Sequence, residues 1–252
     1  MKRNFFEARK DPLTVILQCS TPELAIGRIR NANCLGADAY GLQVESLPAE
    51  FHRPEVYQRI FKEGGGRPFY VTYYRKKHNA DKSDEELARG LLTLAESGAT
   101  LCDVIGDLFC PHPQELTDDV NAIEKQMKLI DQIHEKGAQV LMSSHVLKFT
   151  PAERVLEIAL EQKRRGADII KIVTGAKTME EQLENLRITR LLKEELGAPF
   201  LFLSGGECTL HRRLGLKLGC CMALCVYEHD AYSTASQPLL CTMKTIRDEI
   251  DF

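Results

Sequence analysis

Lys171 has a position in the sequence that favours chemistry over simple structure. It lies in residues 168–174, a run of mostly β-branched side chains that begins after Gly166. Such a run predicts a strand buried on both faces in a parallel sheet. Desolvation opposes the charge of a buried ammonium, and a buried lysine can act as the nucleophile that forms an imine with a ketone or aldehyde. The alternative is a strand-end lysine that reaches the rim or pairs with an acid.

His145 supplies a second reactive group, at the end of another apolar run over residues 139–145. If the runs that hold His145 and Lys171 are neighbouring parallel strands, they lie about 5 Å apart, so their side chains can meet at one end of the sheet. A histidine at a strand end is more often a structural hydrogen-bonding group. Beside an inward-facing Lys171, however, it indicates a general acid and base, because imidazole titrates near neutral pH.

The rest of the chain alternates short apolar runs with longer amphipathic segments about eight times over 252 residues. This alternation predicts a single (β/α)₈ barrel spanning residues 1–252, with an open doubly wound sheet as the alternative. Thr21 and Thr150, each followed by a proline, are expected to cap helices. The expected strands are residues 14–19, 37–45, 69–74, 100–105, 139–145, 168–174, 199–205 and 220–227. The expected helices are residues 22–33, 54–62, 85–97, 118–136, a segment after residue 151, and residues 179–195, 210–218 and 237–251.

The composition favours an ordinary cytoplasmic protein. Apolar residues make up 44% and charged residues 27% of the chain, with no apolar run near the length of a membrane span and no signal peptide. A net charge of -3 gives no electrostatic reason to expect nucleic acid or a membrane surface as partner. Nine cysteines without paired metal-ligand spacing suggest reduced thiols, several of them inside strands. Glu228, His229 and Asp230 lack a second ligand cluster, so no metal site is expected.

Three more polar residues follow the last two expected strands. Arg212 comes after the seventh strand, and its planar guanidinium suits a carboxylate. Ser233 and Gln237 follow the eighth strand, in a segment without regular periodicity. In a barrel, these residues belong to the end at which active sites form.

With these residues, the chain resembles the type I 3-dehydroquinate dehydratases, the Schiff-base branch of the shikimate-pathway enzymes, over nearly its whole length. The segments that carry the resemblance are residues 140–145 with Thr150-Pro151, residues 166–172, Arg212 with Gly215 and Gly219, and residues 233–237. The resemblance places the family's imine-forming lysine on Lys171 and its histidine on His145. It also places the carboxylate-binding arginine on Arg212, and the lid serine and glutamine on Ser233 and Gln237. A homodimer is implied as well.

The chain departs from the family where relatives contact the ring hydroxyls of the substrate. Gly41-Leu42-Gln43 stands where the family has Glu-x-Arg, and Tyr74 and His78 stand where it has an arginine and a glutamate. Gln43 and Tyr74 are therefore expected to line an altered pocket. The loss of several buried polar partners costs about 1 to 3 kcal/mol each, which together is enough to change the preferred substrate.

The predicted function is a Schiff-base lyase that dehydrates 3-dehydroquinate or a related small β-hydroxy keto acid, with no metal or organic cofactor. Lys171 forms the imine, His145 moves the proton, Arg212 and Gln237 hold the carboxylate, and the loop around Ser233 closes over the site. Two alternatives remain. One is a class I aldolase acting on a keto or sugar-phosphate substrate, for which residues 204–206 either cradle a phosphate or form a tight turn. The other is a barrel that binds a ligand without catalysis.

Overall fold

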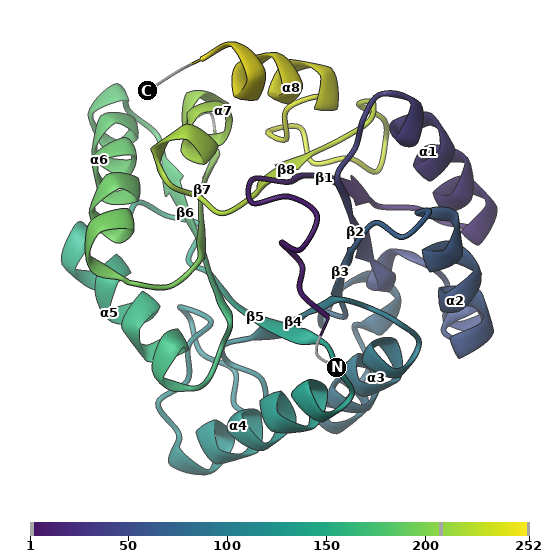
Figure 1. Cartoon of the computed structure of the whole chain (residues 1–252). Helices are drawn as coiled ribbons and strands as arrows, with labels where there is room; N and C mark the ends of the chain where they lie inside the picture. Colours follow the sequence, from purple (N-terminus) through teal and green to yellow (C-terminus); the bar gives the residue numbers. More distant parts are fainter. Residues whose placement is uncertain (1–2, 207–208, 251–252) are drawn as a thin grey trace.

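Eight parallel strands form the centre of the protein. Figure 1 shows them as a ring surrounded by helices in the computed structural model, which describes residues 3–206 and 209–250. The hydrogen-bonded order of the strands is β7-β6-β5-β4-β3-β2-β1-β8. The backbone N–H of Cys221 donates to the carbonyl of Phe200 at 2.8 Å, which joins the segment before β8 to the start of β7. The predicted (β/α)₈ barrel is therefore confirmed.

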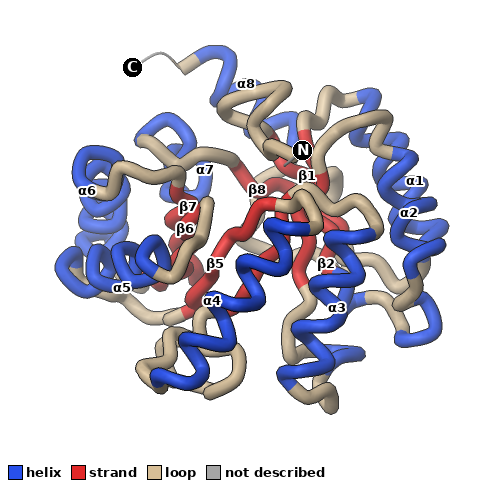
Figure 2. The backbone as a smooth tube through the Cα atoms, turned by 60° about the horizontal axis from the view of Figure 1, so that its bottom comes forward, coloured by secondary structure: helices blue, strands red, loops and turns tan. Residues whose placement is uncertain are grey.

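The elements follow one another in strict alternation, and Figure 2 shows the helices as an outer layer around the strands. The strands are β1 (Leu13–Leu17), β2 (Ala39–Gln43), β3 (Phe69–Thr72), β4 (Leu101–Ile105), β5 (Gln139–His145), β6 (Ile169–Ala176), β7 (Phe200–Gly206) and β8 (Ala223–Cys225). The helices are α1 (Pro22–Cys34), α2 (Pro54–Glu63), α3 (Asp84–Glu96), α4 (Val120–Glu135), α5 (Ala152–Arg164), α6 (Met179–Glu195), α7 (Thr209–Leu218) and α8 (Leu240–Glu249). Three short 3₁₀ helices are η1 (Val44–Ser46), η2 (Ala49–Phe51) and η3 (Lys77–Asn79).

The two predicted helix caps have different outcomes. The side chain of Thr21 accepts from Leu24 N at 3.2 Å and caps α1, as expected. The prediction for Thr150 is wrong, because Pro151 occupies the N-cap position of α5 and makes no side-chain hydrogen bond there. The Thr150 hydroxyl instead donates to the carbonyl of Lys148 at 3.1 Å. The helix begins without this cap, so the packing of its buried face contributes more to its stability than its first turn does.

Two sequence-based expectations about the last strands are also wrong. Ser204, Gly205 and Gly206 do not form a tight turn; they continue β7 and pair with residues 174–176 of β6. Cys220 and Cys221 precede β8, although they were expected inside it. Cys19 likewise lies beyond the end of β1.

The eight cysteines in the described part of the chain all have free thiols. No helix within residues 3–206 and 209–250 is long and apolar enough to cross a membrane. Over the same residues, no group of three His, Cys, Asp or Glu side chains is placed to hold a metal ion.

The loop between β4 and α4, residues 106–119, is fastened from outside the barrel by a buried arginine. Arg165 directly follows α5 and is only 2% exposed. Its guanidinium donates to the carbonyls of Thr117 at 2.5 Å and Gly106 at 3.0 Å, and to the side chain of Gln126 at 2.9 Å. Gln126 in turn donates to the carbonyl of Gly106 at 3.0 Å. Loop backbone that would otherwise lack partners is thus satisfied by side chains, which fixes its course.

Candidate active site

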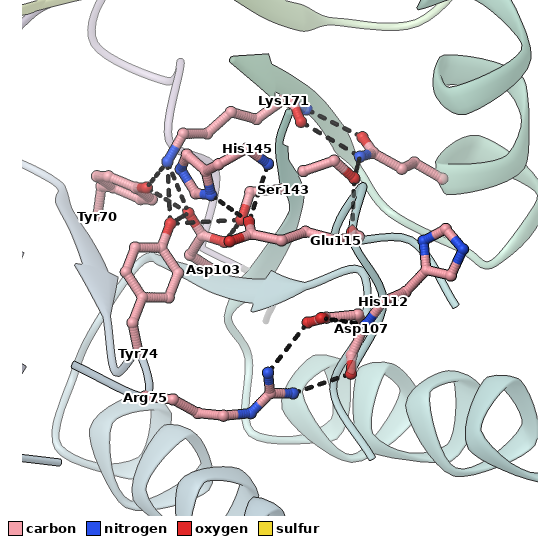
Figure 3. A network of polar contacts seen from close by, with 12 residues as sticks. Tyr70, Tyr74, Arg75, Asp103, Asp107, His112, Glu115, Ser143, His145 and Lys171 are labelled. Carbon is pink, nitrogen blue, oxygen red and sulfur yellow. Dashed lines mark hydrogen bonds and ion pairs between the residues drawn. The ribbon is translucent and has the colours of Figure 1, made fainter. Parts of the chain in front are cut away.

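Lys171 points from β6 into the barrel and is 5% exposed. Its Nζ lies 2.9 Å from the hydroxyl of Tyr70, 3.0 Å from that of Tyr74 and 3.1 Å from Asp103 Oδ2 (Figure 3). Three acceptors match the three N–H groups of an ammonium. Of the two structural alternatives for this lysine, the structure shows pairing with an acid. The pair lies inside the barrel and not at the rim.

Asp103, on β4, is the anion of this pair and is 1% exposed. It accepts hydrogen bonds from the hydroxyls of Tyr70 and Tyr74, and from Ser143 Oγ at 2.5 Å. Burial alone would raise the pKa of the Asp103 carboxyl, but the Lys171 ammonium and the three hydroxyls outweigh it and hold this pKa below the ordinary value. Asp103 is therefore a carboxylate at neutral pH.

The two tyrosines are buried phenols that stay protonated. Desolvation and the neighbouring Asp103 carboxylate raise the pKa of both Tyr70 and Tyr74 well above the ordinary value. Tyr70 lies beside Gly41 in the strand register, and a Cβ at Gly41 would lie 2.3 Å from Ile16 Cδ1 and 3.1 Å from Tyr70 Cδ1. The Ile16 and Tyr70 side chains therefore fill the space into which a longer residue at position 41 would project.

His145, at the end of β5, is oriented by Glu115 from the loop after β4. One Glu115 carboxylate oxygen lies 2.5 Å from His145 Nδ1 and accepts from the His145 backbone N–H at 2.9 Å. The His145 ring also packs edge-on against the Tyr74 ring, with centroids 5.5 Å apart. Because Nδ1 faces a carboxylate, its proton sits there in the neutral ring, which leaves Nε2 as the basic nitrogen.

The protonation of this second pair follows from its surroundings. Burial lowers the pKa of His145, and the Lys171 ammonium adds to that effect, so that together they outweigh the opposing influence of Glu115. Burial would raise the pKa of Glu115, but its hydrogen bonds and charge interaction with His145 bring the pKa below the ordinary value. At neutral pH the pair is therefore a neutral imidazole and a carboxylate, which suits a general base.

Glu115 occupies a costly backbone conformation, with φ at +47° in the left-handed region. Ser144 Oγ donates to its carbonyl at 2.8 Å. A Cβ at Gly106 would lie 2.5 Å from the same carbonyl oxygen, so only glycine permits this close approach. Strain of this kind persists where the surrounding structure over-determines it, often at functional sites.

Replacing Glu115 with glutamine is expected to lower turnover roughly 10- to 100-fold, which is a part of the rate enhancement that general acid–base catalysis supplies. Since Glu115 raises the pKa of His145, its neutralisation should also move the acid limb of the pH–rate profile to lower pH. Steady-state rates between pH 5 and 9 measure both effects. Glu124→Gln, an exposed carboxylate on α4, is the matched control. A Glu115→Gln profile that superimposes on the wild-type profile would contradict this role.

The model of the family described as Type I 3-dehydroquinase matches residues 13–250. The chain belongs to this family. The resemblance inferred from the sequence is thereby confirmed.

Curated relatives carry the same name over shorter alignments. The 3-dehydroquinate dehydratase of Alkaliphilus oremlandii is 35% identical over 95 residues, which are 37% of this chain and 36% of that protein. The one from Geobacillus thermodenitrificans is 27% identical over 169 residues, 66% of this chain and 56% of that protein. The alignments thus cover from about a third to just over half of these relatives' own lengths.

Solved structures of the family share the fold. The 3-dehydroquinate dehydratase of Geobacillus kaustophilus has a TM-score of 0.78 at 16% identity, over 94% of this chain and 89% of that chain. The type I enzyme of Clostridium difficile, solved with covalently modified comenic acid, has a TM-score of 0.77 at 15% identity, over 94% and 91% of the two chains. At such identities the likeness supports the barrel alone.

The residues that the sequence assigned to this family's site fall into two groups. Lys171, His145 and Tyr74 come together, since Tyr74 contacts both of the others. Among the described contacts, the hydrogen bonds of Gln43 and Ser233 go elsewhere. Gln43 Oε1 accepts from Gln18 Nε2 at 2.6 Å, and the Ser233 hydroxyl bonds to the Asp230 backbone at 2.9 and 3.1 Å.

The carboxylate-binding candidates follow β7, which pairs with β6, and β8. Arg212 Nε, on α7, donates to the carbonyl of Ser204 at 2.8 Å, which ties the arginine to the end of β7. Gln237 is 6% exposed, and its Oε1 has no hydrogen-bond partner within residues 3–206 and 209–250. His78, the other departure from the family, is exposed on η3.

Sequence reasoning missed Asp103, Tyr70 and Glu115. Asp103 carried a usable signal, because it is a charged residue in the middle of an apolar strand, as Lys171 is. Tyr70 is one of four aromatic residues in the predicted strand over residues 69–74 and was not distinguishable from core. Glu115 lies in a loop, where nothing in the local sequence indicates that it contacts His145.

Proposed function

We propose that this member of the type I 3-dehydroquinase family dehydrates 3-dehydroquinate, or a related small β-hydroxy keto acid, through an imine on Lys171. The observation that carries the proposal is the buried Lys171 ammonium, held in the barrel with a neutral His145 close by and in contact with the same tyrosine. A buried ion pair is weak evidence for a stabilising role, because packed apolar residues often stabilise a fold as well, so the buried ammonium supports a chemical role.

The reaction proceeds in two stages after the imine has formed. The protonated imine acidifies the neighbouring carbon, and His145 Nε2 takes the proton from that carbon. The C–H electrons form a C=C bond, and the π electrons of C=N⁺ move onto the nitrogen. The resulting enamine expels the β-hydroxyl, which leaves as water with the proton that His145 returns. Glu115 stabilises the imidazolium between the two stages.

Arg212 and Gln237 bind the substrate carboxylate, and the loop that holds Ser233 closes over it. The buried, unpartnered amide oxygen of Gln237 supports a ligand contact at this side chain, in which the oxygen accepts from a ligand hydroxyl and the amide NH₂ donates to the carboxylate. An ion pair between Arg28 of α1 and Asp230 holds the same loop against the barrel. Asp230 also accepts from the Ser233 N–H at 2.8 Å, so the loop is pre-shaped.

The preferred substrate depends on the β2 and β3 side of the pocket. The filled space at Gly41, the amide pair of Gln43 and Gln18, and the Tyr74 phenol support a site that makes fewer charged contacts there than the family pattern provides. A small keto acid with a β-hydroxyl satisfies the remaining groups, which are a nucleophile, a base and a carboxylate site.

Two assays test the proposal together. Incubation with 3-dehydroquinate followed by borohydride reduction should leave a stable mass increase on the peptide that contains Lys171, and enone absorbance should rise in the unreduced reaction. A profile of β-hydroxy keto acids in the trapping assay identifies the preferred substrate. The proposed chemistry fails if none of these compounds leaves an adduct on Lys171.

A homodimer and a cytoplasmic location stay predictions. Exposed apolar side chains on neighbouring helices support the first, namely Leu160 of α5 with Met179 and Leu183 of α6, since a dimer would bury them. Light scattering of the purified chain measures the oligomeric state, and cell fractionation measures the location.

A further inference from the structure

The two phenols beside Lys171 form a path for protons between its ammonium and Asp103. Each phenol oxygen accepts a hydrogen bond from Lys171 Nζ, and each hydroxyl donates to Asp103 Oδ2 (Figure 3). Nζ also reaches Asp103 Oδ2 directly, at 3.1 Å. Ser143 Oγ, 3.3 Å from the Tyr74 hydroxyl, donates to the other carboxylate oxygen of Asp103. All of these groups are buried, and their hydrogen bonds connect them in a ring.

Imine formation from this resting state needs no proton from outside. An ammonium and a ketone give a protonated imine and water, with the same number of protons and the same charge on both sides. Two of the three Nζ protons must leave with the ketone oxygen. They therefore need a route from nitrogen to oxygen, and groups that touch Nζ are placed to supply it.

We propose that Tyr70, Tyr74 and Asp103 are catalytic residues that carry these two protons from Lys171 to the departing oxygen. His145 is then needed only after the imine has formed. The identity of the ketone rests on the proposed function, whereas the relay acts on any carbonyl compound that reaches Lys171.

Nζ gives one proton to Asp103 and becomes a neutral amine, which attacks the carbonyl carbon as the C=O π bond breaks. The alkoxide takes a phenol proton, and the phenol regains one from Asp103. The positively charged nitrogen of this adduct then gives its second proton to Asp103, and the same relay delivers that proton to the hydroxyl. The C–O bond breaks, water leaves, and the nitrogen lone pair forms the C=N bond.

The contacts of His145 and Lys171 favour assigning imine formation to the relay and the later proton transfer to His145. Its Nδ1 is engaged by Glu115, whereas Nζ has its three hydrogen bonds to the phenols and Asp103. The phenols keep their protons at neutral pH because burial and Asp103 raise their pKa, so each has a proton to pass on. Phenylalanine removes only the hydroxyl and keeps the ring, which makes it the appropriate substitution for both tyrosines.

Rapid mixing with a carbonyl compound, followed by borohydride quenching at set times, measures the rate at which Lys171 becomes modified. The probes are 3-dehydroquinate and glyoxylate. Glyoxylate is a small aldehyde, so its access to Lys171 depends little on the shape of the pocket. The proteins are wild type, Tyr70→Phe, Tyr74→Phe, the double variant and His145→Gln. Tyr73→Phe is the matched control, because the Tyr73 hydroxyl faces His52 at 3.0 Å and not Lys171. Circular dichroism confirms that each variant is folded.

Each single phenylalanine variant should form the adduct about 10-fold more slowly, and the double variant about 100-fold more slowly. Tyr73→Phe and His145→Gln should form it at close to the wild-type rate, although His145→Gln should not proceed to dehydration. Wild-type rates in the double variant, or a His145→Gln rate as low as that of the double variant, would overturn the relay. Trapping of wild type by glyoxylate but not by 3-dehydroquinate overturns that substrate and leaves the relay measurable. Trapping by neither probe overturns both.

Discussion

Lys171→Ala should form no borohydride-reducible adduct, and its dehydration rate should fall on the order of 10⁵-fold, as expected when a covalent nucleophile is removed. The loss is this large because the protonated imine is the electron sink for the α-proton, and no other described side chain lies in the same position. Mass spectrometry of the reduced protein and enone absorbance measure the two effects.

Two controls separate lost chemistry from lost structure. Lys171→Arg keeps a cation for Asp103 but cannot form an imine, so it should fold yet remain inactive. Lys62→Ala removes an exposed lysine of α2 and should leave the adduct and the rate unchanged. Residual dehydration in Lys171→Ala above about one hundredth of the wild-type rate would contradict an imine mechanism, because it exceeds what binding and acid–base groups retain alone.

Asp103→Asn should lower the free energy of unfolding by about 3 to 5 kcal/mol at pH 7, since breaking a buried ion pair leaves the other charge uncompensated. Lys171 would keep two phenols as neighbours but lose its carboxylate. Urea denaturation of the two proteins measures the difference. The exposed Asp118→Asn is the control and should change stability by about 0.5 kcal/mol or less.

The pH dependence of the same pair has a defined sign. The pKa of Asp103 in the folded protein is lowered, so the pair stabilises the protein above the unfolded-state pKa of about 3.9. That stability is lost as the pH falls below about 4 toward the folded-state pKa. Wild type should therefore lose stability on acidification more steeply than Asp103→Asn, and equal slopes would contradict the assignment.

A double variant tests whether the two charges act as a unit. Lys171→Met together with Asp103→Asn removes both charges, so its loss of stability should be smaller than the sum of the single losses. Additive losses would mean that the ion pair contributes little to the fold.

Helix and strand periodicity predicted most of the barrel. The bounds of α6 agree with the prediction to the residue, and Gly197, at φ +59°, follows its C-terminal end. The start of β8 was predicted too early. Cys220 and Cys221 are apolar, but their N–H groups bond to Gly215 and Phe200 at 3.0 and 2.8 Å in the connection from α7. Hydrophobicity alone does not distinguish such a connection from a strand.

The predictable part of the site is the part that lies on adjacent strands. Lys171 and His145 belong to β6 and β5, which pair in register, so their proximity follows from the strand order. Glu115 could not be placed in this way, because its position depends on contacts with Ser144 and on the anchoring of its loop. Gln43 and Ser233 were expected at the pocket, and their hydrogen bonds within the described residues instead hold neighbouring loops and strand ends.

The anchoring of the loop after β4 has a consequence for how the sequence can vary. The orientation of His145 depends on Glu115, and the course of that loop depends on Arg165, at the end of an outer helix. A mutational scan would therefore rank position 165 with the residues of the barrel interior, although it contacts none of the reacting groups. Substitution of Arg165 in the outer layer is therefore constrained, because it would disturb the orientation of the His145 imidazole.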